Sequence, residues 1–424
     1  MRLTFACSRA ALLPAAVLCS LLSACTSAGS DAVDGSGLAT VFDSSRTDSL
    51  IARVAGAVAA ELMRGTTEEL RIQPGADDTS SFGEVYEFDV GKDGRIFAFD
   101  ASSRRILLFA ADGALLRAIG RQGAGPGEFN SDNGMVVLPD GRLAVLDAQN
   151  ARISFFSADG DLVTSWVVPS GFSTNNGLRV DAKGTLFLVR PVTPPRENEI
   201  LGRMGLVRLA EGGAFGDSLV APDLPVEQVT YEAVVPGGKS STGPRHSAEF
   251  LWDWHPAGHF VSANGGKYEI ETSREGKPLR IVRDAPVVPV PEDERAWDQE
   301  RITFSMRMND PSWIWSGPPI PSTKPPMSAI NVARDGRIWV RVSMPSEPIP
   351  EVERDPQREG RSPPARFRDA NEYEVFAADG RFVGRVALPA RAQWMEADGD
   401  LVWVLDRDAD WLPGIVRLRV APGF

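Results

Sequence analysis

A tight turn that ends in glycine recurs six times along the chain, and it limits the folds that the sequence can adopt. The six glycines are Gly94, Gly141, Gly184, Gly258, Gly336 and Gly399. Four positions before them stand the apolar residues Val90, Val137, Val180, Trp254, Val332 and Met395, and two positions after them stand Ile96, Leu143, Leu186, Phe260, Ile338 and Leu401. Two apolar strands around a glycine turn are typical of a β-hairpin. The sequence therefore predicts one inner hairpin, repeated six times.

The first two repeats match residue by residue over a longer stretch. Residues 93–113 and 140–160 both contain Asp-Gly-Arg, four mainly apolar residues, Asp, then Arg-Ile and a second Asp-Gly turn. This order predicts a strand, a short turn, another strand, a tight turn and a further strand in each unit. Outer strands are expected at 105–110, 152–157, 205–210, 267–272, 373–377 and 415–420.

Six units of four antiparallel strands make an all-β, six-bladed β-propeller. The sixth unit reaches the end of the sequence after its third strand. A closed ring leaves no such unpaired edge, so an N-terminal strand is expected to complete the blade, with Leu70–Ile72 as the candidate. Residues 49–63 fit either a strand, which would begin at Leu50, or an alanine-rich helix.

The glycine-rich run from Gly120 to Phe129 ends a segment, from Gly94 onward, that resembles an NHL repeat. This segment is most similar to six-bladed propeller lipoproteins of environmental bacteria. This resemblance implies the fold, but not the activity, because propellers include enzymes, scaffolds and receptors.

The first 25 residues have the pattern of a secretory signal peptide. Arg2 and Arg9 precede an apolar stretch, residues 10–22, that is too short to span a bilayer. The stretch ends in Leu-Ser-Ala-Cys, which resembles the lipobox of bacterial lipoproteins, so Cys25 is expected to carry the lipid. Residues 26–37 are small and polar, as in a flexible tether, and 38–424 are expected to form the propeller. Thr26 after the cysteine favours the outer membrane of the bacterial envelope.

The charge and the cysteine content of the chain limit its possible ligands and its possible disulfides. The formal net charge is −12, and it is two units more negative without the leader. Such a chain repels phosphate backbones, which disfavours nucleic-acid binding, and it repels an anionic bilayer, so membrane contact should come from the lipid alone. The three cysteines, Cys7, Cys19 and Cys25, all lie in the leader, so no internal disulfide is expected in the mature chain, which we expect to be a monomer.

Loop length predicts two unequal faces. Turns from the first to the second strand, and from the third to the fourth, are uniformly short. All long insertions fall in the other two connections, which lie on the opposite face: 121–132, 191–202, 221–246, 284–326 and 343–370. Long loops on one side favour a binding face there, against neutral drift. The insertion 284–326 is expected to contain a short helix from about 292 to 307, with acidic residues in its first turn.

Candidate ligand-binding residues follow from this face. Polar residues begin the inner strands at the elaborated end of the channel: Glu84, Asn133, Asn176, Glu249 and Ser328. Trp313 and Trp315, beside a proline-rich run, could stack on a sugar or a peptide, or could simply pack the loop onto the blades. His255 and His259 have a metal-ligand spacing, but Pro256 and Gly258 place them on a hairpin, where chance pairing is the better reading.

Two functions remain open, besides a purely structural role in the envelope. The first is a non-catalytic envelope lipoprotein that binds a glycan, a peptide or another envelope protein, without a cofactor. The alternative is a calcium-dependent lactonase or ester hydrolase, which would use the polar ring of the channel. No phosphate-binding loop, Gly-x-Ser-x-Gly motif or cysteine nucleophile follows the leader, so the sequence leans away from an enzyme.

Overall fold

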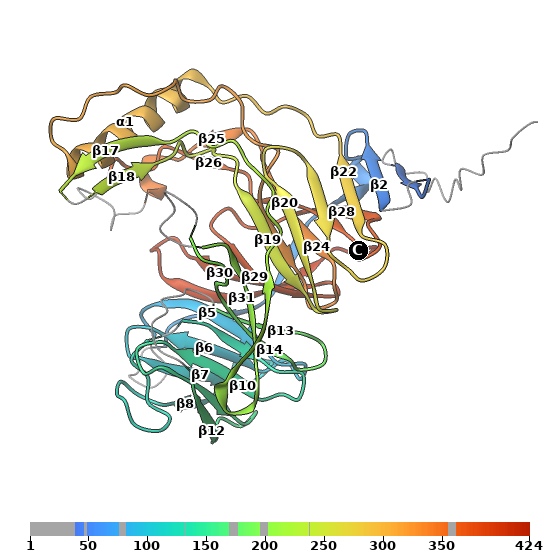
Figure 1. Ribbon diagram of the computed structural model, residues 1–424, viewed down its shortest axis with the longest axis vertical. Coiled ribbons are helices and arrows are strands. Elements are labelled where there is room, and N and C mark those ends of the chain that lie inside the picture. Colours follow the sequence, from blue (N-terminus) through green and yellow to red (C-terminus); the bar gives the residue numbers. More distant parts are fainter. Residues whose placement is uncertain are drawn as a thin grey trace, which may run out of the picture.

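The computed structural model describes residues 39–45, 49–75, 82–131, 133–168, 177–195, 202–236, 238–354 and 362–424. Its strands form six radial sheets around a channel, and the prediction of a six-bladed propeller is confirmed (Figure 1). The expected signal peptide, with Cys25, and the expected tether at 26–37 lie outside the described residues.

Blades 1 to 3 each contain four antiparallel strands in chain order from the inside outward. Blade 1 comprises β5 (Val85–Val90), β6 (Ile96–Asp100), β7 (Arg105–Phe109) and β8 (Leu115–Ile119). Blade 2 comprises β9 (Met135–Val137), β10 (Leu143–Asp147), β11 (Arg152–Phe156) and β12 (Leu162–Val167). Blade 3 comprises β13 (Leu178–Val180), β14 (Leu186–Pro191), β15 (Met204–Leu209) and β16 (Phe215–Val220).

The other blades also include strands from the N-terminal region. Blade 4 comprises β19 (Phe250–His255), β20 (His259–Asn264), β21 (Glu269–Thr272) and β22 (Leu279–Arg283), extended outward by β2 (Leu50–Ala55) and β1 (Ala39–Asp43). Blade 5 comprises β23 (Met327–Val332), β24 (Ile338–Val342), β27 (Glu372–Phe376) and β28 (Phe382–Ala387), with β3 (Met63–Arg64) at its edge. Blade 6 comprises β29 (Gln393–Asp398), β30 (Leu401–Arg407), β31 (Pro413–Val420) and β4 (Thr66–Ile72).

The predicted ring closure is confirmed. Strand β4 pairs antiparallel with β31, and Ile72 lies opposite Ile415. The ambiguous residues 49–63 form strand β2 and a single 3₁₀ turn, Ala60–Leu62, and not an α-helix. The N-terminal region thus runs along the outer edges of blades 4, 5 and 6 in turn, because each edge offers unpaired backbone groups.

The sequence repeats have a direct structural cause. All six predicted turn glycines have positive φ, from 59° at Gly399 to 87° at Gly258, a conformation that side chains with a Cβ disfavour. The repeated Asp100 and Asp147 are almost fully buried at the ends of β6 and β10. Asp147 accepts hydrogen bonds from the backbone N–H groups of Asn130 and Ser131. The carboxylate therefore fastens the linker from the preceding blade.

Three of the long connections that were expected on one face fold together in their described parts. The hairpin β17 (Tyr231–Val235) and β18 (Gly238–Thr242) joins blades 3 and 4, and α1 (Glu292–Asn309) joins blades 4 and 5. The hairpin β25 (Ser346–Pro348) and β26 (Phe367–Asp369) lies within blade 5. We call these three insertions, the described parts of 221–249, 284–326 and 343–371, the insertion module; Figure 1 shows it above blades 4 and 5.

The predicted helix in the module is confirmed and is slightly longer than expected. Acidic side chains at Glu292, Asp293 and Glu294 oppose the positive end of the helix dipole, and Pro311 follows its end. Among the described residues, no helix combines the length and apolar character needed to cross a bilayer.

Candidate functional site

The insertion module has an apolar core of its own. Tyr231 from β17, Ile302 and Met306 from α1, and Trp313 and Ile320 from the following loop are buried together. Trp313 is 7% exposed, and its Nε1 donates to the carbonyl oxygen of Glu232 at 2.8 Å. Separate insertions therefore form one packed unit, which argues against loops that drifted independently.

The placement of the two tryptophans decides between the readings of the sequence. Trp313 is buried in the module, so its ring is not presented to a ligand. Trp315 packs against the Tyr231 ring at a centroid distance of 4.4 Å and is partly exposed. Of the two interpretations of these residues, packing of the loop is the one that fits this geometry.

A buried polar cluster joins the parts of the module. The Lys324 ammonium, whose side chain has no exposed surface, donates to Asp369 Oδ1 at 2.7 Å, to Ser346 Oγ at 2.6 Å and to the Met344 carbonyl oxygen at 2.7 Å. Ser346 in turn lies 2.8 Å from Glu294 on α1. This one cation therefore links the loop after α1 to β25 and β26.

Glu294 connects the cluster to the segment before blade 4. Its Oε1 lies 3.0 Å from Arg245 Nη1 and 2.8 Å from His246 Nε2. Burial alone raises the pKa of Glu294, but the hydrogen bonds from His246 and Ser346 outweigh it, so the net pKa lies below the ordinary value. Glu294 is therefore ionised at neutral pH, and its charge is matched by basic neighbours.

The cluster contains three side chains of the types that bind metal ions. His246, Glu294 and Asp369 offer ligand atoms within 4.8 Å of one another, and they are the one group of at least three His, Cys, Asp or Glu residues in the described parts that does so. Lys324 and Arg245 already compensate both carboxylates. A divalent ion would have to displace a buried ammonium, so the cluster is best described as structural.

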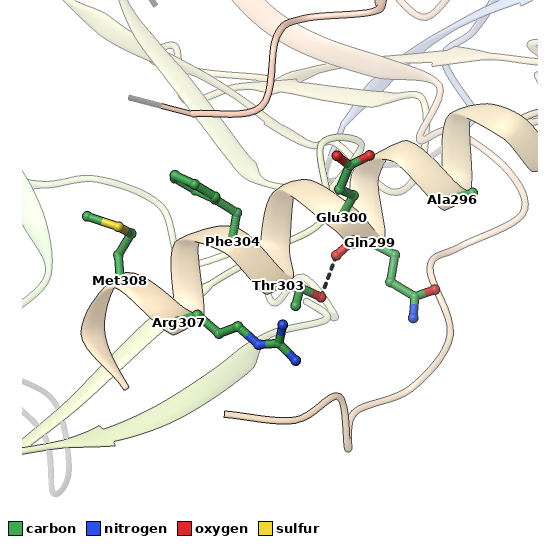
Figure 2. Close-up of a pocket in the computed structure, with 7 residues that line it drawn as sticks. All are labelled: Ala296, Gln299, Glu300, Thr303, Phe304, Arg307 and Met308. Atoms are coloured by element: carbon green, nitrogen blue, oxygen red, sulfur yellow. Dashed lines mark hydrogen bonds between the residues drawn. The ribbon is translucent and has the colours of Figure 1, made fainter. Parts of the chain in front are cut away.

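The outer side of α1 forms an open surface groove of about 550 Å³. Figure 2 shows its seven lining residues: Ala296, Gln299, Glu300, Thr303, Phe304, Arg307 and Met308. Met308 is 71% exposed although methionine favours burial. Methionine, aromatic and arginine side chains are enriched in protein interfaces, and this groove offers all three.

The module also contains several of the most exposed large apolar side chains among the described residues. Each of them is at least 71% exposed: Val234, Val287, Met308, Ile314 and Val352. Single exposed apolar residues are common on protein surfaces. These five residues all lie in the insertion module, which the propeller does not need to close its ring of blades.

The channel contains a second cavity, of about 460 Å³, lined by the inner strands of all six blades. It reaches the face of short turns, because Lys92, Pro139 and Pro256 in those turns line its mouth. Its wall contains side chains of both charges, the acidic Glu87, Asp89, Asp181, Asp253 and Glu396 and the basic Lys92, Arg179 and Arg334.

Buried carboxylates bind neighbouring blades together across this channel. Asp89 Oδ2 accepts from the Val137 N–H at 2.6 Å, and Asp253 Oδ2 accepts from the Val332 N–H at 2.8 Å. Arg334, from the turn of blade 5, reaches Asp89 of blade 1 with a separation of 2.5 Å and lies 3.5 Å from Glu396 of blade 6. One guanidinium thus serves two carboxyl groups, and the shorter contact is with Asp89.

Burial raises the pKa of Glu396 to about 8, and the Asp89 carboxylate adds to the rise although Arg334 opposes it. In the folded protein Glu396 therefore stays protonated up to about pH 8, whereas in the unfolded chain it loses its proton above about pH 4.5. Because the unfolded state is then favoured by ionisation, the free energy of unfolding falls as the pH rises from about 4.5 to 8. We expect Glu396→Gln, which resembles the protonated acid, to be more stable than the wild type by about 2 kcal/mol at pH 8 and to lose this advantage near pH 4. Thermal unfolding of both proteins across this range measures the difference, and a pH-independent difference would contradict the assignment.

The predicted channel residues do not converge on one ligand position. The side chains of Glu84, Glu249 and Ser328 are exposed at the elaborated end, and Glu84 accepts a hydrogen bond from the Tyr86 hydroxyl, which raises the pKa of Tyr86. Asn133 turns toward its own blade, where its Oδ1 accepts from Ser131 Oγ at 2.7 Å and from the Ala148 N–H at 3.1 Å. Asn176 lies outside the described residues. Calcium binding by this set remains a prediction that its geometry does not favour.

His255 and His259 lie at the two ends of the turn between β19 and β20. The rings of His255 and His259 stack at 4.3 Å. His255 Nδ1 accepts from the Ala257 N–H, and its Nε2 lies 3.1 Å from the Gly336 carbonyl oxygen. Both ring nitrogens of His255 are therefore used, and burial lowers its pKa.

The sequence reasoning missed the charged layer of the channel. Asp89 and Asp253 each directly precede one of the repeated apolar residues, Val90 and Trp254. Because side chains alternate along a strand, a polar residue next to a core position faces the channel. That signal was available in the sequence, whereas the contact from Arg334 to a blade two units away was not.

A match to a family model supports the fold. A family model described as a 6-bladed beta-propeller matches residues 77–181. The search of curated proteins gave no match. Among solved structures, the chain is similar to a Bacteroides fragilis protein described as exported, with 10% identity, a TM-score of 0.44 and coverage of 85% of this chain and 99% of the other.

Two enzymes share the same general likeness. The virginiamycin B lyase of Staphylococcus aureus matches with 11% identity and a TM-score of 0.41, over 83% of this chain and 98% of the lyase. A gluconolactonase of Xanthomonas campestris matches with 14% identity and a TM-score of 0.37, over 81% of this chain and 88% of the enzyme. At such identities a likeness extends no further than the fold. By its architecture and by the matched family model, the chain is a six-bladed β-propeller with an added insertion module.

Proposed function

We propose that this protein is a lipoprotein of the bacterial envelope, anchored through Cys25, that binds a partner protein through the insertion module and catalyses no reaction. The observation that supports the proposal is the module itself. Two of its insertions share an apolar core, and a buried ionic cluster links both of them to the third. Such a unit fixes the position of its outer surface, and a preorganised surface loses less entropy on binding.

The chemistry of that surface favours a protein over a glycan or a small molecule. The α1 groove is open to solvent on one side of the helix, whereas small-molecule sites are mostly enclosed. Its mixture of Phe304, Met308 and Arg307 with polar neighbours corresponds to the composition of a protein interface.

The test is site-specific photo-crosslinking in intact cells that express the full chain. A photo-reactive residue at position 304 on α1 should give one discrete protein adduct, and the same residue at position 378, in a short turn of the opposite face, should give none. Met308→Asp should reduce the adduct at least tenfold without lowering the thermal unfolding temperature.

Val167→Asp is the matched control, because Val167 on β12 is 76% exposed and lies outside the module. It should leave the adduct unchanged. Equal adducts at positions 304 and 378, or an adduct that survives Met308→Asp, would overturn the proposal. The Cys25→Ala variant tests the anchor separately, because it should release the protein from the membrane fraction.

A further inference from the structure

The direction of the N-terminal strands bears on which face of the propeller lies nearer the membrane. Strand β2 pairs parallel with β22, and Val54 lies opposite Arg283. Strand β22 ends at Arg283, where the chain enters the insertion that contains α1. The Val54 end of β2 is therefore the end at the elaborated face.

Strand β1 then fixes where the tether joins the propeller. It pairs antiparallel with β2, and Ala39 lies opposite Ala55. Ala39 is thus at the elaborated end of the outermost strand of blade 4, and Asp43, opposite Ile51, is toward the plain end. The described chain therefore begins at the face of the propeller that carries the module.

The length of the tether makes this position matter. Thirteen residues separate Cys25 from Ala39. A flexible chain of that length spans about 20 Å on average and at most about 45 Å. A blade strand of five to six residues is itself roughly 17–20 Å long, so turning the plain face to the membrane would use most of the average reach.

We infer that the insertion module faces the membrane to which Cys25 is attached, and that its partner is a protein held at that same membrane surface. This inference rests on the proposed function. The channel mouth, on the face of short turns, then points away from the membrane.

The bilayer itself is a poor candidate for the partner. Val352, the most exposed apolar residue of the module at 91%, stands between Glu351 and Glu353. Inserting it into lipid would carry two carboxylates toward the apolar phase, at a cost far above the gain from one valine. A protein surface can contact such a residue and leave its acidic neighbours in water.

The experiment measures the distance of each face from the lipid headgroups in the full lipidated protein, reconstituted in vesicles of neutral phospholipid. All three native cysteines lie in the leader, and Cys25 would be acylated, so an introduced cysteine is the one free thiol of the mature chain. Val352→Cys on the module and Ala378→Cys in the opposite turn of the same blade form a matched, exposed pair. Each variant is labelled with a donor dye, and an acceptor dye is placed on the headgroups.

We expect energy transfer at position 352 to be at least twice as efficient as at position 378. Equal transfer, or stronger transfer at position 378, would overturn the orientation. A wild-type protein that does not float with the vesicles would contradict the anchor, and hence the proposed function, before orientation is measured. Strong quenching of the probe at position 352 by quenchers on the acyl chains would show that the module contacts the bilayer, and would overturn the protein partner.

Discussion

Replacing Glu374 by alanine is expected to lower the free energy of unfolding by about 3–5 kcal/mol, the usual cost of removing one partner from a buried ion pair. Glu374 and Arg283 have side chains that are each 1% exposed and lie 3.3 Å apart. Arg385 and the Tyr268 hydroxyl also donate to Glu374, both at 2.7 Å. The variant leaves two guanidinium groups and a phenol without their acceptor between blades 4 and 5.

Denaturant unfolding measures this loss. Glu374→Gln keeps the size and one acceptor but loses the charge, so it should fall between the wild type and the alanine variant. Glu347→Ala, at an exposed site in β25, is the control and should change stability by less than about 0.5 kcal/mol. A loss below about 1 kcal/mol for Glu374→Ala would show that the cluster relaxes or admits water.

Replacing Lys324 by alanine is expected to loosen the insertion module by about 3 kcal/mol while the blades stay folded. The ammonium is the link between the loop after α1, Ser346 and Asp369. Without the ammonium, Asp369 keeps one contact with a lysine or arginine among the described residues. This is the long contact with Arg245, at 3.5 Å. Local opening of β25 and β26 should follow.

Hydrogen exchange resolves this effect along the chain. Amides of 346–348 and 367–369 should exchange faster in Lys324→Ala, whereas those of the inner strands of blades 1 and 2 should not change. Lys239→Ala provides the control within the same module, because Lys239 and Glu232 form an exposed pair that contributes little. Unchanged exchange in β25 and β26 would contradict the role of Lys324, and faster exchange throughout the blades would contradict an independent module.

The apolar residues and turn glycines around each inner hairpin were sufficient to predict the propeller. A turn such as Asp93-Gly94 requires a backbone conformation that glycine adopts freely. Two apolar residues at a fixed spacing from that glycine indicate equivalent core positions in every blade. Both are local properties, so they are readable in one sequence. The closing strand was also predictable, because an incomplete sixth blade needs a partner and Leu70–Ile72 was the available apolar segment.

The candidate sites were less predictable, because they depend on contacts between distant segments. The sequence located the long insertions and the helix in 284–326. It favoured packing over ligand stacking for Trp313 only slightly, whereas the structure places Trp313 in one core with Tyr231 and Ile302. The cluster around Lys324 draws on five separate stretches of chain, and none of its residues forms a recognisable motif.

By itself, the sequence determined the all-β class, the number of blades, the strand that closes the ring and the face that receives the long loops. These follow from the spacing of apolar residues, from the glycine turns and from which connections between successive strands are long, all of which are properties of neighbouring residues. Only the tertiary structure decided that three insertions form one module, that Arg334 spans from blade 5 to blade 1, and that Ala39 joins the body at the elaborated face. Those outcomes depend on packing, charge pairing and strand register between residues far apart in the chain, which no local pattern encodes.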